Sequence, residues 1–120
     1  MEALYMEGTQ ETPKVNFNKS DGMFELSGRS LPEDAVEFYG PVIKWIKAYA
    51  TAPNEVTVFK FKLDYFNTAS SKLVHEILNL LKDIQGIQIE WHYLEDDEDI
   101  LEAGKEFEEQ MSISFAFKLL

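Results

Sequence analysis

The chain has 120 residues, with 11 basic and 22 acidic side chains, a net charge of −11 and no cysteine. This length fits a single domain over residues 1–120, and a composition that is 45% hydrophobic supplies its core. The acidic balance argues against nucleic acid and anionic membranes as partners, and the missing cysteines exclude disulfides and thiolate chemistry. Because the N-terminus lacks a signal-peptide pattern, we expect a cytoplasmic protein, whose charge suits solubility or a basic partner.

Several segments predict β-strands, because apolar residues alternate in them with polar ones. Residues 15–26 predict a hairpin around the turn Ser20-Asp21-Gly22, and residues 55–66, 87–93 and 113–119 predict three further strands. In the longest of these, Phe59, Phe61, Leu63 and Tyr65 fall on one side, and Lys60, Lys62 and Asp64 fall on the other. The sheet therefore has one dry face and one wet face.

Three segments between the strands have the helical period. The first begins at Ser30, where Glu33 three residues later completes a capping box, and a bend or restart is expected at Pro41. The second extends from about Thr68 to Gln85 before Gly86, and the third begins near Asp96 or Asp97.

The alternation of strands and helices implies right-handed parallel crossovers. Since each strand has a single apolar side, the helices should cover that side only. The predicted fold class is α/β, a single two-layer domain with a mixed sheet and its helices mainly on one face. The predicted core comprises Phe59, Phe61, Leu63, Ile77, Leu81, Ile89, Trp91 and Phe115.

Residues 63–72 join the end of a central strand to the start of a helix, where parallel α/β folds gather functional groups. The free N–H groups and the dipole of a helix start favour an anion, and Lys72 one turn beyond Thr68 adds positive charge. A phosphate on Thr68 would therefore be stabilised locally while adding about −1.5 to −2 charges to the surface. Thr68 and Ser71 can both cap a helix. The alternative is that a threonine or asparagine at this helix start is simply a cap, and the physical pattern alone favours this alternative.

Arg29 is the only arginine of the chain. Its planar, bidentate guanidinium suits a phosphate group, which makes Arg29 a candidate for binding one. The alternative is an ordinary surface pair with one of the many carboxylates.

Four motifs resemble, in order and spacing, the SiaC family of regulatory phosphoproteins. They are Gly28-Arg29-Ser30-Leu31-Pro32-Glu33, Phe38-Tyr39-Gly40-Pro41, Tyr65-Phe66-Asn67-Thr68-Ala69-Ser70-Ser71-Lys72 and Trp91-His92-Tyr93-Leu94-Glu95-Asp96-Asp97-Glu98-Asp99. The resemblance spans nearly the whole chain and implies a fold like that of anti-sigma-factor antagonists (STAS domains). It also implies a regulator rather than an enzyme.

Members of this family are phosphorylated on the threonine of an Asn-Thr-Ser-Ser-like motif by a dedicated Ser/Thr kinase and reset by a PP2C-type phosphatase. Their unphosphorylated form binds and activates a diguanylate cyclase, which links them to cyclic di-GMP signalling and biofilm formation. The resemblance therefore implies that Thr68 is the phosphoacceptor, with Asn67, Ser70, Ser71, Lys72 and Arg29 in its neighbourhood. Ala69 departs from the motif, which would have a serine there, so Thr68 stands alone as the acceptor.

Two further functions stay open. One is a partner switch of the anti-sigma-factor-antagonist type that controls transcription. The other is a small metal-dependent hydrolase, which would use the acidic run with Ser70 or Ser71. The carboxylates in question are Asp96, Asp97, Glu98 and Asp99.

We expect no cofactor and no tightly bound metal. The acidic run lacks the glycine and the alternate oxygen spacing of a calcium-binding loop, and acidic residues complement a helix start without any ion. Calorimetric titration with calcium and with magnesium should show no binding at micromolar concentrations. A saturable site that is lost in Asp97→Asn would contradict this expectation and favour the hydrolase.

Overall fold

The computed structural model describes all 120 residues as one six-stranded mixed sheet with three helices. The strands lie in chain order: β1 (Leu4–Met6), β2 (Lys14–Asn18), β3 (Met23–Ser30), β4 (Thr57–Phe66), β5 (Ile87–Tyr93) and β6 (Phe115–Leu119). Strands β1 to β3 are antiparallel and β3 to β6 are parallel, with α1 (Ala35–Ala50), α2 (Thr68–Leu81) and α3 (Glu98–Met111) as crossovers. None of these helices combines the length and the apolar character needed to cross a membrane.

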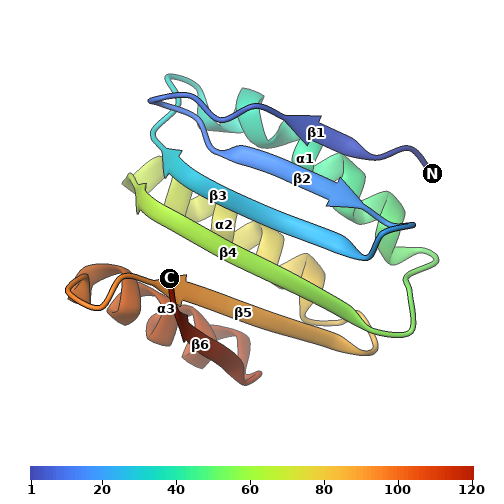
Figure 1. The fold of residues 1–120 in the computed structure, drawn as a ribbon. Helices are drawn as coiled ribbons and strands as arrows, with labels where there is room; N and C mark the ends of the chain where they lie inside the picture. Colours follow the sequence, from blue (N-terminus) through green and yellow to red (C-terminus); the bar gives the residue numbers. More distant parts are fainter.

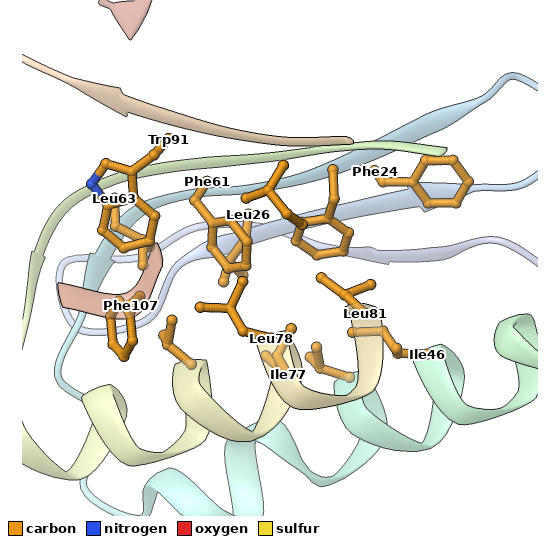
Figure 2. Close-up of a cluster of buried hydrophobic side chains, with 14 of the residues drawn as sticks. Phe24, Leu26, Ile46, Phe61, Leu63, Ile77, Leu78, Leu81, Trp91 and Phe107 are labelled. Carbon is orange, nitrogen blue, oxygen red and sulfur yellow. The ribbon is translucent and has the colours of Figure 1, made fainter. Parts of the chain in front are cut away.

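All three helices cover the same face of the sheet and leave the other face open (Figure 1). The core lies between these two layers, where apolar side chains of the strands meet those of the helices (Figure 2). All eight residues of the predicted core are buried there. The predicted fold class is therefore confirmed.

Trp91 of β5 anchors α3 to the sheet. Its side chain is 1% exposed and packs between Phe61 and Phe107, with ring centroids 5.4 and 5.7 Å away. The indole Nε1 donates a hydrogen bond to the carbonyl oxygen of Ile100 at 2.9 Å. Helix α3 approaches this ring closely at Gly104, where an added Cβ would overlap the indole. Glycine at this position thus permits the close packing of helix and sheet.

The first helix begins later than the capping-box pattern predicts. Strand β3 extends through Ser30, and α1 begins at Ala35 with Asp34 as its cap, whose Oδ1 accepts from the Glu37 N–H at 3.0 Å. Ser30 is fully buried, so its hydroxyl lies in the core and does not cap a helix. The prediction of a Ser30 cap was wrong because a polar residue in a motif does not reveal which way it points.

The other helix limits agree more closely with the prediction. Helix α3 begins directly after Asp97, as predicted. Helix α1 is one continuous helix through Pro41, so the restart expected there is wrong. Helix α2 begins at Thr68 but ends at Leu81 instead of Gln85. Gly86 follows with a φ of +82°, and an added Cβ would overlap the Glu55 carbonyl oxygen, so this glycine makes the turn into β5.

A β-bulge near the end of β4 corrects the predicted position of Tyr65. Gly28 of β3 pairs with Leu63, but the next residue, Arg29, pairs with Tyr65, which leaves Asp64 as an extra residue. The shift turns Tyr65 to the open face, where it is 46% exposed. The Arg29 guanidinium lies over the Tyr65 ring, 5.6 Å from its centroid.

The two edges of the sheet are short strands. Strand β1 has three residues, and its weak alternation did not predict it. At the other edge, the first N–H of β6, on Phe115, donates to Oε2 of Glu108 at 2.8 Å instead of to a neighbouring strand. The carboxylate of α3 therefore occupies the free side of β6.

Gly104→Ala should lower the free energy of unfolding by about 1–3 kcal/mol, because the added methyl group has to displace the buried Trp91 ring. Without this contact, replacing glycine by alanine in a helix interior would stabilise the helix by roughly 1 kcal/mol. Lys105→Ala, at the next and exposed position, is the control and should change stability by less than about 0.5 kcal/mol. Urea unfolding measures both variants, and a stabilised Gly104→Ala would contradict the close contact with Trp91.

Candidate functional site

The junction between β4 and α2 lies at the carboxyl edge of the parallel strands (Figure 1). Asn67 fixes this junction as the cap of α2. Its Oδ1 accepts from the Ser70 N–H at 2.9 Å, and its carbonyl accepts from the Ser71 N–H at 2.9 Å. Its own N–H donates to the Ser30 carbonyl at 3.1 Å. Asn67 is therefore the helix cap, and Thr68 is not needed for that role.

Thr68 is the first residue of α2 and is exposed. With Asn67 bonding the N–H groups of Ser70 and Ser71, the N–H groups of Thr68 and Ala69 remain without a partner in the protein. An anion bound to the Thr68 oxygen would find two unused donors and the positive end of the helix dipole beside it.

The electrostatic surroundings of this helix start differ from those of the other two helices. The first turn of α1 contains Glu37 and that of α3 contains Glu98 and Asp99, whereas the first turn of α2 contains no acidic residue. Lys72, one turn further along, is exposed. In a chain with 22 acidic residues, this helix start is left open for a negative charge.

A buried hydroxyl cluster of Ser30, Tyr39 and Ser70 lies beneath the junction. The Ser30 Oγ is 2.6 Å from the Tyr39 hydroxyl and donates to the Ser70 Oγ at 2.8 Å, and all three residues have 0% exposure. Burial raises the pKa of Tyr39 to about 12, while the hydroxyls of Ser30 and Ser70 oppose the rise. The cluster joins β3, α1 and α2 at one point, and it leaves the Ser70 hydroxyl inaccessible to a substrate or kinase.

A groove with a cavity volume of about 300 Å³ separates α2 from α3 next to this junction. It combines polar and apolar side chains, namely Ser71, Lys72, His75, Ala103, Glu106, Phe107 and Gln110. Ser71 and Lys72, both predicted neighbours of Thr68, therefore face α3. Sequence reasoning missed the residues that α3 contributes, because no motif connects the two helices.

Arg29 occupies the open face of the sheet. Its Nε donates to the Gln10 carbonyl at 3.2 Å and its guanidinium stacks on Tyr65. The neighbouring Ser30 bonds Asn67, so Arg29 lies at the same edge of the sheet as the junction. Its contacts hold it beside Tyr65 rather than in an ion pair.

The acidic run forms the start of α3. Asp97 is the cap, with Oδ1 accepting from the Ile100 N–H at 3.0 Å, and Glu98 and Asp99 lie in the first turn. No three acidic or histidine side chains in the structure are arranged to hold a metal ion. Capping and dipole compensation account for this run.

The structure is thus a one-sided α/β domain with an exposed threonine at a helix start, on the carboxyl edge of its sheet. The chain belongs to the SiaC family of regulatory phosphoproteins, whose family model matches residues 6–120. The family is one of regulators, which agrees with the expectation that the chain is not an enzyme.

Relatives of known sequence and structure support this assignment. The chain is 33% identical to an uncharacterized protein of Pseudomonas aeruginosa (strain UCBPP-PA14), over 98% of this chain and 97% of the relative. It is similar to a crystal structure of the diguanylate cyclase SiaD in complex with its activator SiaC from Pseudomonas aeruginosa, with 30% identity, a TM-score of 0.90 and coverage of 98% and 99%. Apo-SiaC from the same organism matches with 31% identity, a TM-score of 0.85 and coverage of 99% and 98%.

Tyr39→Phe should reduce the loss of stability at alkaline pH. Because the pKa of Tyr39 is about 12 in the folded chain and about 10 in the unfolded chain, the unfolded state loses its proton first as the pH rises. The contribution of this hydroxyl is therefore present below pH 10 and declines between about pH 10 and pH 12. Urea unfolding at about pH 8 and pH 11 should show a smaller difference for the variant than for the wild type. An equal difference would contradict the burial of this hydroxyl.

Proposed function

We propose that the chain is a phosphorylation-controlled activator of a diguanylate cyclase and that phosphate on Thr68 switches it off. The observation that carries this proposal is the exposed Thr68 at an acid-free helix start, in a member of a family of regulatory phosphoproteins. The similarity to SiaC, which is the activator of SiaD in their complex, supports the choice of partner.

The switch needs no change of fold. The unbonded N–H groups of Thr68 and Ala69 can donate to phosphate oxygens, while Asn67 keeps the helix capped through its own bonds. Instead, the added phosphate charge opposes binding of the partner surface, through repulsion and through the free-energy cost of desolvating the phosphate. A coupling of about 1–3 kcal/mol changes affinity by roughly one to two decades.

The proposal includes two enzymes that set the phosphorylation state in the cytoplasm. A dedicated Ser/Thr kinase would modify Thr68, and a PP2C-type phosphatase would remove the phosphate. The accessible position of Thr68 and the inaccessible position of Ser70 support a single acceptor. Through the cyclase, the switch would act on cyclic di-GMP signalling and biofilm formation.

Thr68→Asp should abolish binding to the cyclase while changing stability by less than about 1 kcal/mol, because Asn67 and not Thr68 caps the helix. Thr68→Ala should bind constitutively. Thr51→Ala is the control, since Thr51 is also exposed but lies at the other end of a helix. Pull-downs with each variant, accompanied by thermal unfolding, measure both effects.

Intact-mass measurement of the chain from its native host provides the second test. A single phosphate adduct should appear, disappear on treatment with a PP2C-type phosphatase and be absent from Thr68→Ala. If the Ala and Asp variants bind equally, Thr68 is not the switch. If Thr68→Ala captures an anti-sigma-type kinase in place of a cyclase, the output is transcription.

A further inference from the structure

The basic residues of the chain gather on the open face of the sheet. Five of the 11 basic side chains lie there, whereas only three of the 22 acidic ones do, by strand position. The basic residues are Lys14, Arg29, Lys60, Lys62 and Lys118, and the acidic ones are Glu25, Asp64 and Glu90. The rest of the chain therefore has 6 basic and 19 acidic side chains, a net charge of −13 against −11 for the whole chain.

Strand register aligns part of this charge into a stripe across the sheet. Lys14 pairs with Ser27, Ser27 with Lys62, and His92 with Lys118. The pair of Phe61 with Trp91 places the following residues, Lys62 and His92, next to one another. The stripe crosses five strands, which at about 4.8 Å per strand spacing gives a length of about 19 Å.

The stripe continues to the aromatic side chain that the bulge exposes. Arg29 and Tyr65 lie one step further toward the carboxyl edge, with the guanidinium stacked on the ring. Tyrosine and arginine are among the residue types enriched in the energetic centres of protein interfaces. Thr68 lies three residues beyond Tyr65, so the stripe and the switch belong to the same end of the sheet.

Few carboxylates neutralise this surface. The two lysine–carboxylate ion pairs of the structure both lie on this face, Lys62 with Glu25 at 3.4 Å and Lys118 with Glu90 at 3.8 Å. The same Glu90 forms a hydrogen bond with His92 Nε2 at 3.0 Å. Lys14, Lys60 and Arg29 make no ion pair. Cationic capacity is therefore left for a partner.

We propose that the open face, across Lys14, Arg29, Lys62, Tyr65, His92 and Lys118, is the docking surface for a short acidic segment of the cyclase. A long polyanion such as nucleic acid would extend beyond the stripe onto the acidic remainder of the surface, whereas a short protein segment stays within it. The inference rests on the proposed function and explains the sign of the switch. Phosphate on Thr68 adds negative charge at the edge of this surface and opposes an acidic partner.

Lys62→Ala combined with Lys118→Ala should weaken binding to a SiaD-type diguanylate cyclase of the source organism by about tenfold. The matched control combines Lys44→Ala with Lys105→Ala, which removes the same charge from exposed positions on α1 and α3 and should change affinity by less than about twofold. Tyr65→Ala is a second variant that leaves the charge intact, and it should also weaken binding by about tenfold. Calorimetry measures each affinity with unphosphorylated protein, and circular dichroism confirms that each variant is folded.

Salt supplies an independent readout. Wild-type affinity should fall between about 50 mM and about 500 mM NaCl, and the Lys62/Lys118 variant should show a weaker dependence. If both surface variants bind as tightly as the control while Thr68→Asp still loses binding, the docking surface is wrong and the proposed function stands. If unphosphorylated wild type does not bind the cyclase, both proposals fail. If the variants alter only self-association in sedimentation, the occupant is a second copy and the acidic-partner assignment is overturned.

Discussion

The buried contact among Ser30, Tyr39 and Ser70 is the constraint that positions the site. A strand end, a helix interior and a helix start meet at these hydroxyls, and each polar group is satisfied by another from a different element. An unpaired hydroxyl at such a position would cost roughly 1–3 kcal/mol, so the three elements are held to one arrangement. Asn67 adds the backbone bond to Ser30, and together these contacts present Thr68 on a rigid support.

A rigid support suits a switch that acts by charge. The Thr68 hydroxyl is not part of this cluster, so the proposed phosphorylation would change the surface without disturbing the buried packing. Ser70 lies only two residues away, but its hydroxyl is part of the buried cluster itself. Two residues of one motif therefore lie in opposite environments, because the Thr68 side chain is exposed and the Ser70 hydroxyl is part of the buried cluster.

Much of the fold could be predicted because burial imposes simple periods on the sequence. The alternation in Phe59, Phe61 and Leu63 and the helical stripe containing Ile77 and Leu81 place those residues in the core. The failures share a cause, since Ser30 and Tyr65 are placed by long-range register and not by local pattern. A bulge shifts Tyr65 to the open face, and a hydrogen bond to a distant helix draws Ser30 inward.

The candidate site was only partly accessible to sequence reasoning. The position of Thr68 at a helix start follows from local pattern, but the resemblance to a family was needed to prefer phosphorylation over capping. Charge distribution was least predictable, because net charge averages over all faces. A bulk value of −11 suited solubility or a basic partner, yet the strands gather lysine side chains on one face of the sheet.

The contact between Glu108 and the Phe115 N–H has a consequence for how these molecules behave in a crowded cell. An unpaired edge strand invites another chain to extend the sheet, and repeated extension produces polymers. Glu108 occupies the first outward donor of β6 and places a carboxylate where an incoming strand would have to lie. The opposite edge, β1, offers only three residues for pairing. Both edges of the sheet thereby resist extension by another chain.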